Sequence, residues 1–137
     1  MFRTKLKVRF NHVDAAGIVF YPRYYEMLNN VVEEWFEQKL GYDFRALNDD
    51  LGAGVPAVSI NSEFPNACHL GDVLDFRLVV ERLGNSSIYL DIQAEVNDLN
   101  CLSAQMTLIY VLSKTDSSIR STPIPDNLRL AMLADSV

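Results

Sequence analysis

The chain has 137 residues, which is the length of one domain rather than two. Its content of 49% hydrophobic and 22% charged residues is close to that of average globular proteins and excludes a disordered or low-complexity chain. The formal net charge of −6 disfavours nucleic acid as a partner, because phosphate binding requires a concentrated basic surface. We therefore expect a single domain over residues 1–137 with its own hydrophobic core.

Targeting and metal-binding signals are missing from the sequence. The longest apolar run, near Leu108–Leu112, is too short to cross a bilayer, and residues 1–10 lack the continuous apolar segment of a signal peptide. Cys68 and Cys101 do not have the spacing of a zinc or redox motif, and we interpret them as half-buried hydrophobic residues. A catalytic pair of Cys68 and His69 is disfavoured, because adjacent residues on a strand face opposite sides. His69 is interpreted instead as a turn residue near Gly71. These features predict a cytoplasmic protein that holds no metal.

Two elements are predicted in the first part of the chain. Residues 5–10 alternate between apolar and basic side chains, which predicts a half-buried strand. Its expected inner residues are Leu6, Val8 and Phe10, and its expected outer residues are Lys5, Lys7 and Arg9. A long helix with a broad apolar face is predicted from Pro22, which suits a first helical turn, to Leu40, where Gly41 ends it.

The rest of the chain is typical of an antiparallel sheet. Residues 42–54 are polar and irregular and predict a loop with a short helical turn. Four strands follow, at Val55–Phe64, Val73–Leu83, Ser87–Asn97 and Cys101–Leu112, before a turn-rich tail and a closing helix over Asp126–Ala134. Short turns between strands favour a meander, and one long helix against one sheet makes the fold α+β. The unpaired edges of such a sheet favour a homodimer or a larger homo-oligomer.

The segment from His12 to Pro22 carries the candidate chemistry. It places the carboxylate of Asp14 among small and apolar residues, where partial desolvation would make it a general base or a nucleophile. The N–H groups around Tyr21, at the start of the helix, are suited to hold an oxyanion, and Gly17 permits a tight turn. The alternative is that Asp14 only accepts hydrogen bonds from the N–H groups of its own loop.

The run Asp14-Ala15-Ala16-Gly17-Ile18-Val19 resembles the N-terminal motif of hotdog-fold acyl-CoA thioesterases. The 4-hydroxybenzoyl-CoA thioesterase type is the most similar, together with the related Tol-Pal-linked short-chain thioesterases. The likeness continues through Pro56–Ser59, Phe64, Gly71–Leu74 and Gly84–Ser87. It implies a long central helix wrapped by a five-stranded antiparallel sheet, in dimers or dimers of dimers with active sites at the subunit interface.

The resemblance also implies roles for particular residues. Asp14 would attack the thioester carbonyl or activate a water molecule, the backbone N–H of Tyr21 would hold the oxyanion, and Gly17 would shape the turn. The substrate would be an acyl- or aroyl-CoA, hydrolysed to the free acid and CoA, with no further cofactor. The candidate substrate-binding residues are His12, Tyr24 (as a wall of the acyl pocket), Ser59, Arg82 and Ser87.

Three positions depart from the family pattern. His12 stands where a second acidic residue is common, so its imidazole either keeps Asp14 ionised or lies exposed at the end of the strand. Tyr21 stands where short-chain relatives have histidine, and Arg82 alone remains of a basic cluster near residues 83–87. The alternatives to a thioesterase are a non-catalytic acyl-binding module and a hotdog dehydratase or hydratase, which the lack of histidine in the long helix disfavours.

Overall fold

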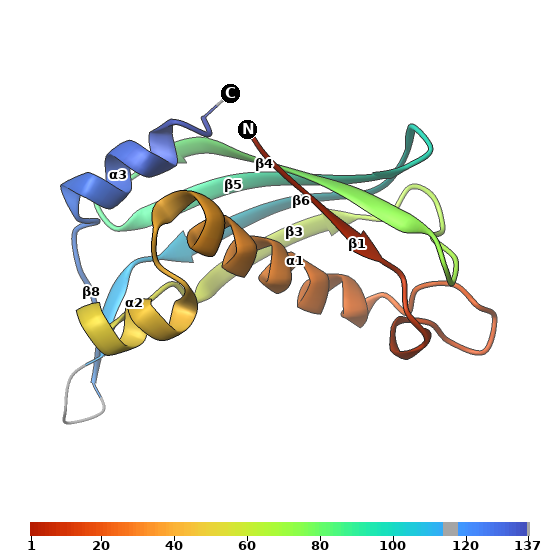
Figure 1. The fold of residues 1–137 in the computed structure, drawn as a ribbon, viewed down its shortest axis with the longest axis horizontal. Helices are drawn as coiled ribbons and strands as arrows, with labels where there is room; N and C mark the ends of the chain where they lie inside the picture. The colour runs from red at the N-terminus through yellow and green to blue at the C-terminus, as the bar shows by residue number, and fades with distance from the viewer. Residues whose placement is uncertain (114–117, 137) are drawn as a thin grey trace.

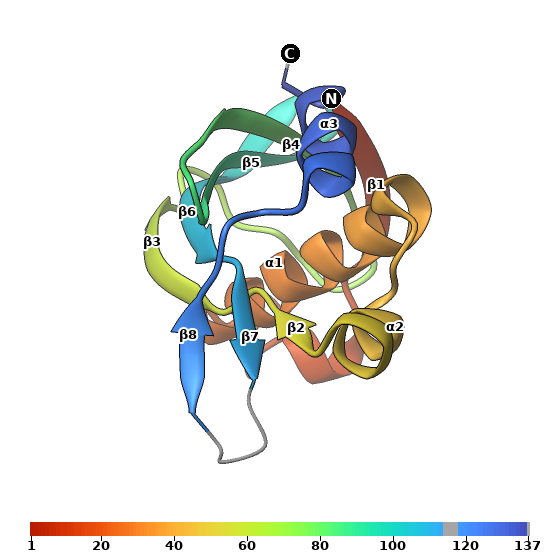
Figure 2. The same ribbon diagram turned by 90° about the vertical axis from the view of Figure 1, so that its left-hand side faces the viewer.

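The computed structural model describes residues 1–113 and 118–136. Its main sheet contains five antiparallel strands in the order β1-β4-β5-β6-β3. Their bounds are Phe2–Lys7 (β1), Ala57–Glu63 (β3), Val73–Leu83 (β4), Ser87–Val96 (β5) and Leu99–Ile109 (β6). The helix α1, Pro22–Trp35, lies against the concave face of this sheet (Figures 1 and 2). The predicted α+β fold, a long helix wrapped by a five-stranded antiparallel sheet, is confirmed.

The helix α1 forms where apolar residues recur at helical spacing. Its buried residues are Tyr24, Met27, Leu28, Val31, Val32 and Trp35. The predicted helix to Leu40 is divided, because the regular α-helix ends at Trp35 and a π-helical turn, η2, continues over Phe36–Leu40. Gly41 ends this turn in the left-handed region at φ +81°, as expected of a glycine at this position.

The first strand begins and ends about three residues earlier than its sequence pattern predicts. Val8 is buried, but its N–H and C=O are bonded to Asp72 O (2.8 Å) and Gly71 N (3.0 Å). The chain then turns into a 3-10 segment, η1, over Phe10–His12. The prediction that Phe10 faces the core was therefore wrong, and its side chain is 83% exposed.

The four strands after α1 do not form a simple meander. β4, β5 and β6 are consecutive neighbours, whereas β3 pairs with β6 at the edge of the sheet. Residues 64–72 therefore connect two strands that are not neighbours, and the predicted meander through short turns was wrong for the step from β3 to β4. The reason is that β3 and β4 are separated in the sheet by β5 and β6.

Smaller elements complete the fold. An eight-residue helix, α2 (Phe44–Leu51), replaces most of the predicted loop, and Asp43 caps it by accepting the N–H of Ala46 at 2.7 Å. A second sheet contains β2 (Ala53–Gly54), β7 (Val111–Ser113) and β8 (Ile119–Ser121), so the last predicted long strand is divided between β6 and β7. The closing helix is confirmed as α3, Asp126–Leu133. Residues 114–117 of the predicted tail lie outside the described residues.

The core lies between α1 and the inner face of the sheet. The predicted alternation in β5 is confirmed, because Ile88, Leu90, Ile92 and Ala94 are all buried. Trp35 is fully buried and donates its indole N–H to Asp135 Oδ2 at 3.1 Å, which ties the end of α1 to the C-terminal segment. Both cysteines are free, and both are fully buried rather than half-buried.

Candidate active site

The segment between η1 and α1 is a backbone-bonded loop. Asp14 donates its N–H to Ile18 O and Gly17 donates to Asp14 O, both at 3.0 Å, while Phe20 donates to His12 O at 2.9 Å. Gly17 has a φ of +77°, a conformation that residues with a Cβ rarely adopt. The loop therefore closes through the tight turn for which the sequence provides a glycine.

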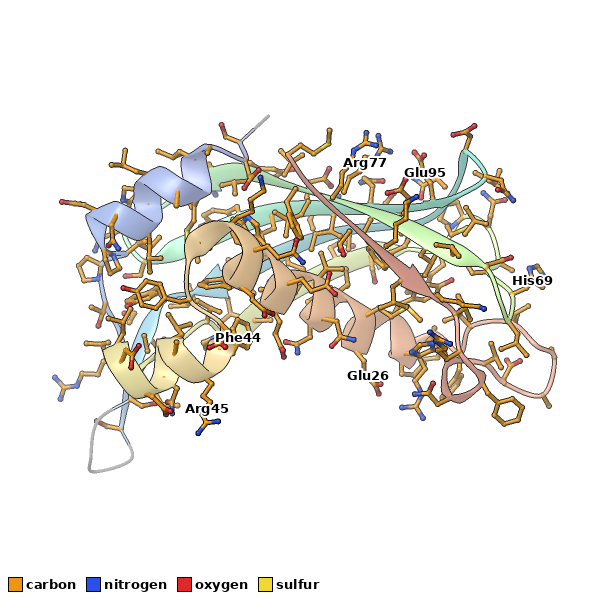
Figure 3. All side chains as sticks on the ribbon, viewed as in Figure 1. Glu26, Phe44, Arg45, His69, Arg77 and Glu95 are labelled. Atoms are coloured by element: carbon orange, nitrogen blue, oxygen red, sulfur yellow. The ribbon has the colours of Figure 1, made fainter. Side chains whose placement is uncertain are left out.

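The same loop is anchored to the connection between β3 and β4. Val19 donates its N–H to Cys68 O at 2.9 Å, and Leu70 donates to Gly17 O at 3.0 Å. These bonds flank an antiparallel bridge between Ile18 and His69, and His69 itself lies at this end of the molecule (Figure 3). The loop is thus fixed on two sides before any ligand binds.

Only one carboxylate oxygen of Asp14 accepts a hydrogen bond from its own loop. Oδ1 accepts the N–H of Ala16 at 2.8 Å, which matches the alternative interpretation of Asp14 as a loop-stabilising residue. Oδ2 has no hydrogen-bond donor among the described residues, and the side chain is exposed. The single chain does not provide the desolvation of Asp14 that is expected from the sequence.

Tyr21 is the residue that precedes the first turn of α1, and Pro22 follows it as the first helical residue. Within the described part of the chain, no carbonyl accepts the N–H of Tyr21. This donor lies at the positive end of a 14-residue helix, which is a favourable place for a developing negative charge. Asp14 and Tyr21 thus lie on one fixed loop, with a carboxylate oxygen and a backbone donor both available.

His12 is oriented by its own short turn. Its Nδ1 accepts the N–H of Arg9 at 2.8 Å, which requires an unprotonated Nδ1. Burial lowers the pKa of His12, and among the nearby charges Glu26 raises this pKa while Arg23 and Arg9 lower it. A neutral imidazole directed at Arg9 does not supply the positive charge that would keep Asp14 ionised.

Arg82 and Ser87 lie at the end of β4 and the start of β5, whereas the loop around Asp14 is anchored to residues that directly precede β4. Ten residue steps along β4 span about 33 Å at ~3.3 Å per residue. Arg82 places its guanidinium 3.6 Å from the centre of the Tyr89 ring, and Ser87 O accepts the N–H of Gly84 at 2.8 Å. One chain therefore does not bring these candidates to Asp14.

Tyr24 and Ser59 occupy two further positions. Tyr24 is buried in α1 and stacks on Phe64 with ring centroids 5.1 Å apart. Burial raises the pKa of its hydroxyl far above the ordinary value, so this group stays neutral. Ser59 is exposed on the edge strand β3. Tyr24 donates its backbone N–H to Tyr21 O at 3.1 Å, but no hydrogen bond among the described residues joins the side chain of Tyr24 or Ser59 to Asp14, and their roles stay predictions.

Other nucleophile and metal sites are not supported among the described residues. Burial raises the pKa of the Cys68 thiol to about 12, so its thiolate is scarce at neutral pH. His69 is exposed while Cys68 is buried, and the two do not form a pair. In residues 1–113 and 118–136, no group of three or more His, Cys, Asp or Glu residues is placed to hold a metal ion. No helix in this part of the chain is long and apolar enough to cross a membrane.

Sequence reasoning missed one feature beside the loop. A hollow of about 680 Å³ is lined by Lys7, Val8, Arg9, Phe10, Asn11, Leu70 and Gly71. The alternating pattern assigned Phe10 to the core, and alternation alone does not distinguish an inward aromatic from one that follows the end of a strand. The signal that could have shown the difference is Asn11-His12 directly after Phe10, because asparagine favours turns.

Comparison with known proteins defines the class of this fold. A gentisyl-coenzyme A thioesterase has a TM-score of 0.83 at 24% identity over 96% of this chain and 99% of its own. The 4-hydroxybenzoyl CoA thioesterase from Pseudomonas sp. strain CBS-3 has a TM-score of 0.84 at 21% identity, over 95% and 97%. A 1,4-dihydroxy-2-naphthoyl-CoA thioesterase from Synechocystis has a TM-score of 0.84 at 18% identity, over 98% and 96%. The architecture is therefore the hotdog fold.

The family follows from the sequence itself. Residues 8–132 match the model of the thioesterase-like superfamily, and the chain belongs to this superfamily. A search of curated proteins finds no match. The expectation of a hotdog-fold enzyme of the thioester hydrolase class is confirmed at the level of this family.

Proposed function

We propose that the protein hydrolyses acyl- or aroyl-CoA thioesters to the free acid and CoA. The observation that carries the proposal is the pairing, on one fixed loop, of an open Asp14 oxygen with the open N–H of Tyr21. A thioester carbonyl set between them would have an attacking or activating carboxylate beside its carbon and a donor beside its oxygen.

The reaction can proceed by either of two routes at this site. With Asp14 as general base, it removes a proton from water, hydroxide adds to the carbonyl carbon, and the C–S bond breaks as the proton passes to the thiolate. With Asp14 as nucleophile, the carboxylate adds first and expels the thiolate, and water then hydrolyses the mixed anhydride. In both routes the Tyr21 N–H stabilises the negative oxygen of the tetrahedral intermediate.

A second copy of the chain would complete the site. Asp14 is exposed in the single chain, and Arg82 and Ser87 lie where β4 ends and β5 begins, at the opposite end of the same sheet. The edge strand β3 and its surroundings expose large apolar side chains, including Val58 (61% exposed) and Phe64. Pairing of two molecules along this edge would cover these side chains and could bring one end of each sheet to the other end of its partner. A homodimer or homotetramer with Arg82 or Ser59 contacting substrate across the interface fits this arrangement.

The direct test is release of free thiol from a panel of aliphatic and aromatic acyl-CoAs. The proposal requires hydrolysis of at least one class of acyl-CoA at a rate typical of enzymes, with the acid and CoA formed in equal amounts. Tight binding of acyl-CoA without release of thiol would favour the non-catalytic acyl-binding alternative. Addition of water to an enoyl-CoA would favour the hydratase alternative.

A further inference from the structure

The hollow beside the catalytic loop has the composition of a ligand site. Its exposed apolar surface comes from Phe10 and Leu70 (50% exposed), which both present their side chains to solvent, whereas Val8, which also lines the hollow, is buried. Its volume of about 680 Å³ lies within the range of small-molecule sites. Phe10 is more exposed than Leu70 although an aromatic ring gains more from burial. A flat partner that stacks on this ring would remove that exposure.

The charges at the rim of the hollow are all of one sign. Lys7 and Arg9 are exposed, and neither forms a salt bridge with a carboxylate among the described residues. None of the seven residues lining the hollow is acidic, in a chain whose net charge is −6. Most other described arginines are engaged: Arg23, Arg45 and Arg77 form ion pairs with Glu26, Asp49 and Glu95, and Arg129 donates to backbone carbonyls. The hollow is thus a local basic site that is suited to an anion.

The hollow is also connected to the catalytic loop. Leu70, which forms one of its walls, donates its N–H to Gly17 O, and Gly71 donates to Val8 O, both at 3.0 Å. A ligand in the hollow therefore contacts the same backbone network that holds Asp14. In contrast, Arg82 lies about 30 Å away along β4 and already faces the ring of Tyr89.

We infer that this hollow binds the adenine nucleotide of the CoA substrate, with the base stacked on Phe10 and the phosphates paired with Lys7 and Arg9. The inference rests on the proposed function, because it names the part of a CoA thioester that the Asp14 loop itself does not contact. A purine base offers a flat apolar face on which the exposed ring of Phe10 can stack. The phosphates offer negative charges with which Lys7 and Arg9 can form ion pairs. The same site would make recognition of CoA a property of each chain.

The test compares two substrates that carry the same acyl group, one on CoA and the other on N-acetylcysteamine, which has no nucleotide. We expect the double variant Lys7→Gln/Arg9→Gln and the variant Phe10→Ala each to raise KM for the acyl-CoA by about tenfold with kcat unchanged. Their kcat/KM for the N-acetylcysteamine thioester should equal that of the wild type. The matched control is Arg3→Gln, which removes a cation from the same strand outside the hollow and should leave both substrates unaffected.

Binding of CoA alone, measured by calorimetry, separates this inference from the proposed function. A tenfold weaker binding of CoA in the hollow variants would support the inference even if the wild type released no thiol. Equal CoA affinity in wild type and variants would overturn it, as would a rise in KM with Arg82→Gln only.

A shift of Phe10→Ala to monomers would show that a second copy covers the hollow, and would also overturn it. Variants that hydrolyse a carrier-protein thioester more slowly, but the acyl-CoA at the wild-type rate, would overturn it as well.

Discussion

At one end of the main sheet, the loop after η1 leaves Asp14 Oδ2 and the Tyr21 N–H without partners among the described residues. At the other end, the turn between β4 and β5 has its polar backbone groups occupied. Arg129 of α3 donates to Gly84 O (2.8 Å) and Asn85 O (3.1 Å), and Ser86 O accepts the N–H of Tyr110 at 2.8 Å. The two ends share the same strands, so the difference arises from what packs on them.

This contrast distinguishes groups that are available for catalysis from groups that stabilise the fold. Groups that are satisfied by the chain contribute to the folded state, whereas open groups on a fixed backbone are available to a substrate. The end with Asp14 also carries the uncovered cations Lys7 and Arg9, while the opposite end is closed by α3 (Figure 1). We therefore expect substitutions of the open groups at the first end to change activity, and substitution of Arg129, which occupies the carbonyls at the second end, to change stability.

The largest effect is expected at Asp14. The variant Asp14→Asn keeps the shape of the side chain and removes its negative charge, so kcat should fall by a factor on the order of 10² or more. The melting temperature should change little, because the amide oxygen can still accept the Ala16 N–H. Initial rates of thiol release and thermal unfolding measure the two properties. Near-wild-type turnover in a folded variant would exclude Asp14 from the chemistry.

Assembly should have the next largest effect. We expect a dimer or larger species at micromolar concentration, and Val58→Glu should shift it toward monomers, because a carboxylate would be buried at the β3 edge. Activity should fall at least tenfold with the loss of the dimer. Light scattering combined with activity assays measures both, and Ile119→Glu, at an apolar position of β8 with similar exposure (65%), is the matched control. A fully active monomer would show that one chain contains the whole site.

At the opposite end of the sheet, Arg129→Met should lower the free energy of unfolding by about 1–2 kcal/mol, since two charge-assisted hydrogen bonds to Gly84 and Asn85 are lost. The aliphatic part of the side chain is retained, so packing changes little. Urea unfolding measures the change, with kcat as the readout of function. A large fall in kcat without a change in stability would contradict the assignment of this end to structure.

The smallest effect concerns His12 and pH. Burial places the pKa of His12 below its ordinary value of 6.5 in the folded state, so the unfolded chain binds more protons just below this pH. The stabilising contribution is complete above about pH 6.5 and should be lost as the pH falls through the lower folded-state pKa. His12→Asn should therefore flatten the decline of the unfolding free energy between pH 7 and pH 5. Overlapping curves for the wild type and His12→Asn would contradict this.

The fold was predictable wherever one side of an element is buried. The alternation in β5 and the helical spacing in α1 correctly assign their inner faces, because burial imposes the period directly on the sequence. The pairing of β3 with β6 was not predictable from these patterns, since strand order depends on contacts between distant residues. The position of Phe10 was missed for a related reason: alternation does not reveal that the strand ends at Lys7.

The candidate site was predictable only in part. The motif around Asp14 and Gly17 correctly indicated a tight loop before a helix, because glycine and a helix start have local signatures. The separation of Arg82 from Asp14 could not be seen, because it depends on the direction in which β4 runs. The hollow beside Phe10 was also hidden, since its walls come from residues 7–11 and 70–71, which are distant in sequence.

The most direct measurement is a crystal structure of the Asp14→Asn variant with an intact acyl-CoA. The account predicts that the thioester oxygen accepts the N–H of Tyr21 within about 3 Å and that the carbonyl carbon lies beside the side chain at position 14. Binding of the thioester group elsewhere, with Tyr21 and position 14 both in contact with solvent, would contradict the account.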